Sequence, residues 1–230
     1  MNENELVVHS WSELCERLYD NAWKPDLGRF RSDYAFRGLS DKNYRLQNSF
    51  SRICRNNSHL EYHMLRNFKK YGQFDDPSML SSDWRVMTLA QHHGLPTRLM
   101  DWTYSPFVAL HFATEDPSTY DRDGIIWQVD YVRVNRLLPD PLKGVMERIG
   151  ANAFTVEMIE EAVPTLQDFD AYHGAHRDLV IFFEPPSINS RIVNQFAFFS
   201  VMSTATGSLD EWVYHYPELY RRIIIPHELK

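Results

Sequence analysis

Residues 91–103 read Gln-His-His-Gly-Leu-Pro-Thr-Arg-Leu-Met-Asp-Trp-Thr and join two apolar segments, residues 84–90 and residues 107–113. Charged groups that lie between buried elements are costly unless they are paired or bind something. The stretch therefore predicts either a polar structural cluster or a functional site at the centre of the fold.

The segments on both sides of this stretch have the local signals of helices. Ser82 and Asp83 are suited to cap a helix that runs to about His92, and Gly94 fits the left-handed position that ends it. Ser105 and the proline after it open a second helix, which is apolar nearly all round and is therefore expected to be buried. Residues 97–100 between the two helices are predicted to form a short strand.

The remaining pattern predicts an α+β fold. We expect further helices at residues 10–18, 60–71, 145–149 and 156–163, and strands at residues 34–38, 124–130, 179–183, 196–202 and 222–225. The order lacks the regular strand–helix alternation of a doubly wound parallel sheet. The sequence has no internal repeat and no long linker. It therefore predicts one domain over residues 1–230, with a mixed sheet that could divide in two, flanked by helices.

Composition limits the classes of partner. The net charge of -7 gives no overall positive field for binding nucleic acid. No run of about 18 apolar residues indicates a membrane span, and residues 1–10 do not resemble a secretory signal. The two cysteines, Cys15 and Cys54, are too few for a disulfide scaffold and suggest a reducing compartment. We therefore expect a cytoplasmic protein without a membrane partner.

Motifs of several common enzyme classes are missing. The sequence has no G-x-x-x-x-G-K-[ST], no G-x-G-x-x-G and no G-x-S-x-G pattern. This argues against a P-loop NTPase, a Rossmann dehydrogenase and an α/β-hydrolase.

Two other groups of residues carry candidate chemistry. Arg37 follows Phe36 and precedes Gly38 at the end of a predicted strand. The arginine fork can grip a phosphate, and the glycine can let a ligand approach the backbone, although a structural ion pair and a turn explain the same residues. Arg98 and Asp101 form either a structural ion pair or a pair in which one positions the other toward a ligand.

The adjacent histidines have a weaker claim to chemistry. His92 and His93 point about 100° apart on a helix, which disfavours a shared metal ion. Since His93 falls on the apolar face of its helix, we expect a core histidine or part of a pocket wall. A metal-dependent hydrolase built on His92, His93, His111 and Asp101 remains a weaker alternative, and no metal ligand is assigned.

These motifs closely resemble those of the FRG domain family, which is named for its Phe-Arg-Gly motif. The middle motif of that family is similar to residues 91–103 and is followed, as here, by an apolar helix that begins with proline. Residues 191–195, followed by Phe198, resemble its late motif, with Ala197 in place of an expected glycine. The resemblance covers about residues 36–199, with its core motifs between residues 34 and 202.

The order of the motifs is in turn similar to that of the ADP-ribosyltransferase fold. The resemblance implies that Arg37 holds NAD and that Gln195, where that fold has Glu or Gln, acts near the acceptor or the ribose. Asp101 is the alternative acid for stabilising positive charge at the ribose carbon, with Arg98 nearby to keep its pKa low. On this analogy the catalytic candidates are Arg37, Asp101 and Gln195, and the residues expected to bind NAD are Gly38, Gln91, His92, His93, Thr97, Arg98, Trp102 and Thr103.

The function implied is therefore that of an NAD-binding, ADP-ribosyltransferase-like enzyme, such as a toxin or phage-defence effector. NAD would be a substrate, no metal is expected, and the acceptor is a protein, a nucleic acid or a small molecule. The alternative is a non-catalytic module that uses the same pocket to bind a nucleotide or a protein.

Overall fold

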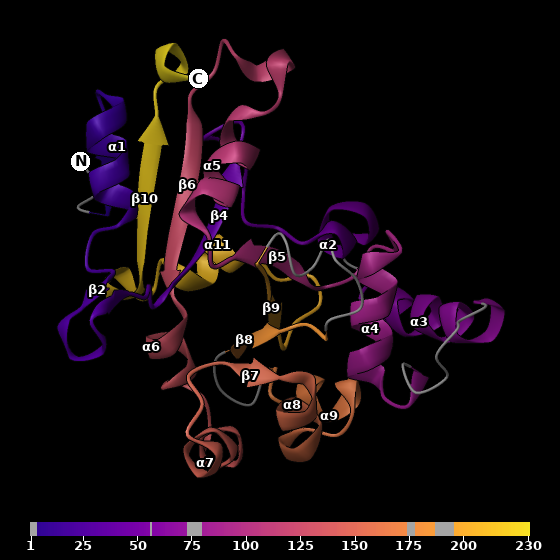
Figure 1. The fold of residues 1–230 in the computed structure, drawn as a ribbon. Helices are drawn as coiled ribbons and strands as arrows, with labels where there is room; N and C mark the ends of the chain where they lie inside the picture. Colours follow the sequence, from indigo (N-terminus) through magenta and orange to yellow (C-terminus); the bar gives the residue numbers. More distant parts are fainter. Residues whose placement is uncertain (1–3, 56, 73–79, 174–177, 187–195) are drawn as a thin grey trace.

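The structure, a computed structural model, describes residues 4–55, 57–72, 80–173, 178–186 and 196–230. Within these ranges the chain folds around an eight-stranded mixed sheet with helices on both faces (Figure 1). The predicted α+β class and mixed sheet are confirmed. No helix in the described ranges is both long enough and apolar enough to pass through a membrane.

The elements follow one another without regular alternation. The strands are β1 (Glu5–Val7), β2 (Trp23–Lys24), β3 (Arg29–Phe30), β4 (Tyr34–Leu39), β5 (Met100–Thr103), β6 (Gly124–Asp130), β7 (Phe154–Thr155), β8 (Val180–Glu184), β9 (Ala197–Met202) and β10 (Tyr220–Ile225). The helices are α1 (Trp11–Leu18), α2 (Ser49–Cys54), α3 (Leu60–Tyr71), α4 (Asp83–His92), α5 (Pro106–Thr114), α6 (Tyr131–Asn135), α7 (Asp140–Ile149), α8 (Val156–Ala162), α9 (Leu166–Asp170) and α11 (Leu209–Val213). Short 3₁₀ turns lie at Pro25–Leu27, Pro117–Thr119, Pro217–Leu219 and His227–Leu229.

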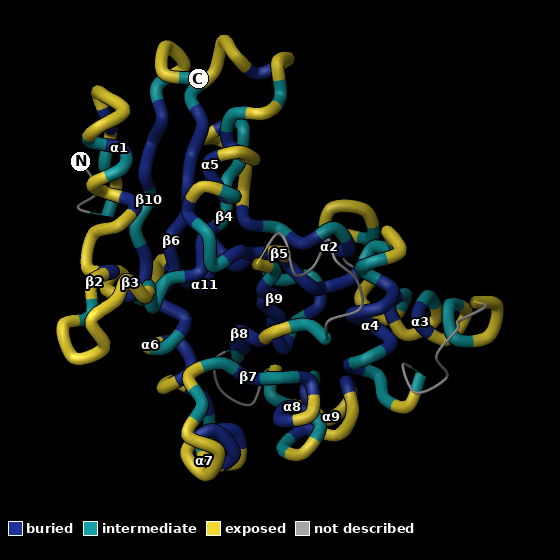
Figure 2. The backbone as a smooth tube through the Cα atoms, in the orientation of Figure 1, coloured by how far each residue is buried: buried dark blue, intermediate teal, exposed yellow. Residues whose placement is uncertain are grey.

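The strand order in the sheet is β1-β10-β6-β4-β5-β9-β8-β7. Neighbouring strands are antiparallel from β10 through to β8, whereas the short edge strands β1 and β7 pair in parallel. Every residue of β6 is buried, as predicted for a central strand (Figure 2). The sheet is therefore mixed because of its edges, and its interior is antiparallel.

One narrow junction joins the two halves of the sheet. Strand β4 pairs with β6 along its whole length, but the described pairing of β4 with β5 consists of Phe36 opposite Thr103. In Figure 1 the strands β5 and β7 of one half run across the view, whereas β10 and β6 of the other half run upward. The sheet is thus continuous, yet it is nearly divided at the place where the first two sequence motifs meet.

Helices cover each half of the sheet, and each half has its own hydrophobic core. Helices α1 and α5 pack on β4, β6 and β10 through residues such as Leu14, Ala109 and Ile126. Helices α3, α4, α7, α8 and α9 pack against the other half through residues such as Trp84 and Phe183. Helices α6 and α11 share a third cluster with residues from both halves of the sheet. The junction between β4 and β5 is therefore held from several sides.

Helix boundaries follow from the capping residues that the sequence indicated. The Ser82 side chain accepts a hydrogen bond from the main-chain N–H of Arg85 at the start of α4, and Ser105 does the same for Val108 in α5. Gly94 has a φ of +79°, and therefore ends α4 in the left-handed conformation. These local predictions are confirmed.

Two predictions, one about the middle motif and one about the helix that follows it, were wrong in detail. The strand begins at Met100 instead of Thr97, because Thr97 is bound to other partners: its main-chain N–H donates to Ser49 Oγ, and its hydroxyl accepts from the main-chain N–H of Leu99. Helix α5 is not buried all round, because Phe107 and Phe112 are 44% and 37% exposed. Phe107 instead stacks on the exposed ring of Trp11.

Candidate functional site

A cleft of about 590 Å³ lies at the junction between β4 and β5, and we call it the first cleft. Its lining brings together the Phe-Arg-Gly strand, the end of α4, strand β5 and helix α5, which are separate in sequence. The lining residues are Phe36, Arg37, Gly38, Leu39, Ser40, Tyr44, Arg52, Gln91, His92, Gly94, Asp101, Trp102, Thr103, Val108, Ala109, Phe112, Ala197 and Phe199. The first and middle motifs therefore converge in space, as the site hypothesis requires.

Arg37 is half-buried on β4 and donates a hydrogen bond from Nη1 to the main-chain oxygen of Asp101 on β5. Burial lowers the pKa of Arg37 below its ordinary value; the negative charge of Asp101 opposes this effect and the positive charge of Arg52 adds to it. Because an arginine in a protein remains protonated, the guanidinium is a fixed positive charge in a partly desolvated position.

Arg52 is a second positive charge in the first cleft, and the sequence did not single it out. It is exposed on α2, where Asn48 caps the helix by accepting from the main-chain N–H of Ser51 at 2.7 Å. In the described part of the chain, Arg52 has no ion-pair partner. The short helix α2 carries no strong periodic signal, so only the fold reveals that Arg52 faces the same cleft as Arg37.

A chain of hydrogen bonds fixes the carboxylate of Asp101. The buried Thr97 hydroxyl donates to Gln91 Oε1 at 2.7 Å, so the amide nitrogen of Gln91 points the other way. That nitrogen donates to both carboxylate oxygens of Asp101, at 3.2 and 3.1 Å. Thr97 is thus a positioning residue behind the cleft, whereas Gln91 and Asp101 lie in its wall.

Replacing Thr97 by valine tests this chain of hydrogen bonds. The change keeps the side-chain volume but leaves the Gln91 carbonyl and the Leu99 N–H without their partner. We expect the free energy of unfolding to fall by about 1–3 kcal/mol, measured by urea denaturation. The matched control is Thr114→Val, since the Thr114 hydroxyl only donates to carbonyls of its own helix, and a loss as large in the control would contradict the assigned role.

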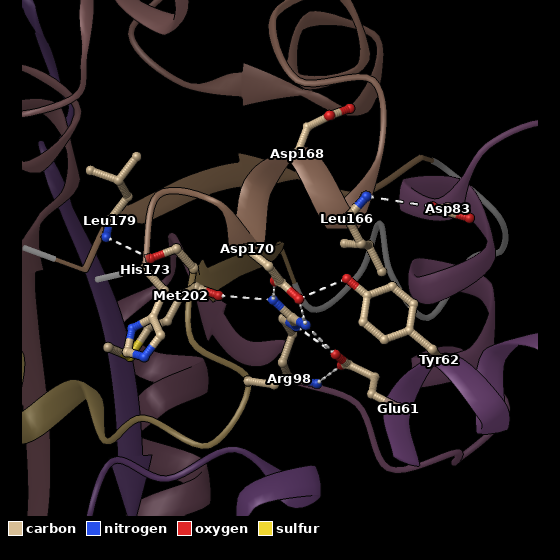
Figure 3. Close-up of polar contacts among 12 residues, drawn as sticks. Glu61, Tyr62, Asp83, Arg98, Leu166, Asp168, Asp170, His173, Leu179 and Met202 are labelled. Atoms are coloured by element: carbon tan, nitrogen blue, oxygen red, sulfur yellow. Dashed lines mark hydrogen bonds and ion pairs between the residues drawn. The ribbon is translucent and has the colours of Figure 1, made fainter. Parts of the chain in front are cut away.

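The structure places Arg98 away from the first cleft and away from the carboxylate of Asp101. Its Nε donates to Glu61 Oε2 at 2.6 Å, and its main-chain N–H donates to Glu61 Oε1 at 2.9 Å. Nη1 and Nη2 both donate to the carboxylate of Asp170, whose Oδ2 also accepts from the Tyr62 hydroxyl at 2.7 Å (Figure 3). Arg98 therefore ties α3 to α9.

The expected pairing of Arg98 with Asp101 was wrong. Both the Arg98 and the Glu61 side chains are only 1% exposed, so this is a buried ion pair. The pKa of Arg98 is raised: burial alone would lower it, but the charges and hydrogen bonds of Glu61 and Asp170 outweigh burial. The arginine of the middle motif thus has a structural role, and its guanidinium binds Glu61 and Asp170 instead of Asp101.

The other candidates differ in their position. His92 lines the first cleft, but His93 is exposed at the end of α4 and is not the core histidine expected from its spacing. Trp102 and Thr103 line the cleft, with the indole Nε1 of Trp102 held by Ser200 Oγ at 2.8 Å. Gln195 lies outside the described residues, so its place in the site stays a prediction.

Gly38 lines the first cleft, but its need for glycine comes from elsewhere. A Cβ atom at Gly38 would overlap the main-chain oxygen of Ala109 and would lie 2.9 Å from the nitrogen of Ala113. The glycine therefore permits the backbone of α5 to contact β4 directly. The sequence had suggested either a turn or the close approach of a ligand as the reason for this glycine.

Acidic and metal-binding groups are sparse here. Among the described residues that line the cleft, Asp101 is the one carboxylate. No group of three or more His, Cys, Asp or Glu residues suited to hold a metal ion occurs in the described ranges. What the cleft offers is two arginines, one positioned acid and several aromatic rings.

Comparison with known proteins identifies the domain. Residues 32–122 match the family model of the FRG domain, a range that contains the Phe-Arg-Gly strand and the whole middle motif. The chain matches no curated protein and no solved structure. The resemblance to the FRG domain family is therefore confirmed over residues 32–122, which is less than half of the chain.

Proposed function

We propose that the first cleft binds NAD, or a closely related dinucleotide, and that the protein transfers or releases its ADP-ribose group. The observation that supports this most strongly is the presence of Arg37 and Arg52 in one cleft with Asp101. Two like charges that face the same space repel each other, and an anion between them would relieve that repulsion.

The two guanidinium groups suit a diphosphate. Each can donate two parallel hydrogen bonds to phosphate oxygens, and Arg37 is already oriented by its bond to the main-chain oxygen of Asp101. The cleft volume of about 590 Å³ falls in the range that holds drug-sized ligands. Exposed rings of Tyr44 and Phe112 at the cleft offer surfaces on which a base or a nicotinamide could stack.

Asp101 suits the charge that develops during the reaction. The bond between the ribose C1′ and the nicotinamide nitrogen breaks, and its electron pair leaves with neutral nicotinamide. An acceptor nucleophile then forms a bond to C1′ and loses its proton, and if the acceptor is water the products are ADP-ribose and a proton. A carboxylate held by Gln91 would stabilise the positive charge at C1′ without reorganising.

One observation favours a second function, namely binding without turnover. Asp101 is exposed and is the single carboxylate among the described lining residues. Water that reaches it weakens its effect on a developing cation. A module that binds a nucleotide through Arg37 and Arg52 would need no such acid.

Release of nicotinamide from NAD, followed by mass spectrometry, tests the proposed reaction. We expect the unchanged protein to release nicotinamide and Arg37→Ala to be slower by about 10²–10³-fold, because a preorganised charge is lost. Arg52→Ala should also be slower, and this exposed residue can change without threatening the fold. The matched control is Arg29→Ala, an exposed arginine on β3 that does not line the cleft.

The outcomes separate the two functions. Release by the unchanged protein and by the control alone supports the enzyme. Binding of NAD without release, with cell extract present as a source of acceptors, supports the module. If the protein neither binds NAD nor releases nicotinamide, both functions are contradicted. If the enzyme acts as a toxin or defence effector, expression should harm the host cell, and Arg37→Ala should relieve that harm.

A further inference from the structure

A second cleft of about 650 Å³ borders the first at the same end of β5. Thr103 and Ala197 line the first cleft, whereas the residues next to them, Tyr104 and Phe196, line the second. The wall of the second cleft comes from the segment after β3, the turn before α5, the start of α6, the end of α7, the start of α8 and the end of β8. None of the sequence motifs assigns a role to it.

The second cleft contains one negative and one positive side chain. Glu184 is exposed at the end of β8, and its Oε1 accepts a hydrogen bond from the Tyr104 hydroxyl at 3.0 Å. Burial and the nearby charge of Glu184 raise the pKa of Tyr104, so the phenol remains a donor. Arg31 is exposed in the same wall. Within the described ranges neither Glu184 nor Arg31 has an ion-pair partner, and each is available to a ligand.

Tyr131 adds a hydroxyl group to the wall of the second cleft. The residue lines the second cleft and is 3% exposed, and burial raises the pKa of its phenol to about 12. In the described part of the chain, its hydroxyl makes no hydrogen bond. The hydroxyl belongs to the wall of the cleft, where it can form a hydrogen bond with a polar group of a ligand.

The remaining surface is apolar. Ala153 and Met158 form part of the wall together with Ile149, which is half exposed. The exposed rings of Phe30 and Phe196 also line the cleft. An apolar group bound here would remove both its own surface and these side chains from water.

We propose that the second cleft binds a small zwitterion with an apolar side chain, either a free amino acid or a dipeptide. The ammonium group binds Glu184, the carboxylate binds Arg31, and the side chain packs on the apolar wall. A simple cation would face the charge of Arg31, and a simple anion would face that of Glu184. This site does not depend on the function proposed for the first cleft.

Calorimetric titration with defined probes tests the proposal. The probes are L-phenylalanine and the dipeptide L-phenylalanyl-L-phenylalanine, with glycine as the probe that lacks an apolar side chain. N-acetyl-L-phenylalanine lacks the positive charge, and L-phenylalanine amide lacks the negative one. We expect glycine, N-acetyl-L-phenylalanine and L-phenylalanine amide each to bind at least about tenfold more weakly than L-phenylalanine. Tighter binding of the dipeptide would identify a peptide as the ligand, and tighter binding of L-phenylalanine a free amino acid.

Variants place the binding in this cleft. Arg31→Met, Glu184→Gln and Tyr131→Phe should each lower the affinity for the probe that binds more tightly, the first two by about tenfold. Arg29→Met is the matched control for Arg31, and Arg37→Ala should leave binding unchanged because it lies in the other cleft. The proposal is overturned if neither probe binds at millimolar concentration, or if the variants bind as well as the unchanged protein.

Discussion

Arg98→Met is expected to lower the free energy of unfolding by about 3–5 kcal/mol, which is the usual cost of removing one partner of a buried ion pair. Methionine retains the apolar stem but leaves Glu61 charged and 1% exposed, with no guanidinium beside it. Asp170 loses its partner as well, although it retains the hydrogen bond from Tyr62. Urea denaturation followed by tryptophan fluorescence measures the change.

Two further variants give this prediction its controls. In the double variant Arg98→Met, Glu61→Met both charges are gone, and we expect much of the lost stability to return. Arg148→Met breaks an exposed pair with Glu161 and should cost less than about 1 kcal/mol. If Arg98→Met cost no more than Arg148→Met, the structural role of Arg98 would be refuted.

Gly38→Ala is expected to destabilise the protein by about 3 kcal/mol or more, at or above the upper end of the usual cost of overpacking. The added methyl group would overlap the carbonyl of Ala109, and a backbone atom cannot rotate away as a side chain can. Helix α5 would have to move off β4. Because Val108 and Phe112 of α5 line the first cleft, we expect this variant to lose affinity for a ligand in that cleft as well as stability.

The matched control for Gly38 is another glycine with free space around it. Gly144 lies inside α7, and a Cβ atom there would meet nothing within 4 Å. Gly144→Ala should therefore stabilise the protein by about 0.5–1 kcal/mol, because alanine is the better helix former. Equal thermal midpoints for Gly38→Ala and the unchanged protein would show that α5 does not depend on this close contact.

Much of the fold could be predicted from the sequence because its signals are local. Ser82, Ser105 and Gly94 cap helices through bonds to residues a few positions away. The fully buried β6 appears in the sequence as a mainly apolar run, Gly-Ile-Ile-Trp-Gln-Val-Asp at residues 124–130. The convergence of Arg37 with Asp101 was also anticipated, but through resemblance to a family and not through spacing.

The rest depends on contacts that no local pattern contains. Glu61 lies 37 residues before Arg98 in the chain, so nothing near the middle motif indicates the partner of its arginine. Arg98 was therefore assigned to a ligand although it stabilises the core. The requirement for glycine at position 38 likewise arises from the backbone of α5, which a sequence does not display.

The single pair of residues between β4 and β5 also has a mechanical consequence. Where two halves of a sheet are joined by one pair of residues, little backbone hydrogen bonding opposes a change in the angle between the halves. Arg37 and Asp101 lie on opposite sides of this junction, and the hydrogen bond between them adds a link between the two halves. A ligand that bound both residues would restrict the angle between the two halves. The flexibility of the sheet at this junction would therefore differ between the free and the ligand-bound protein.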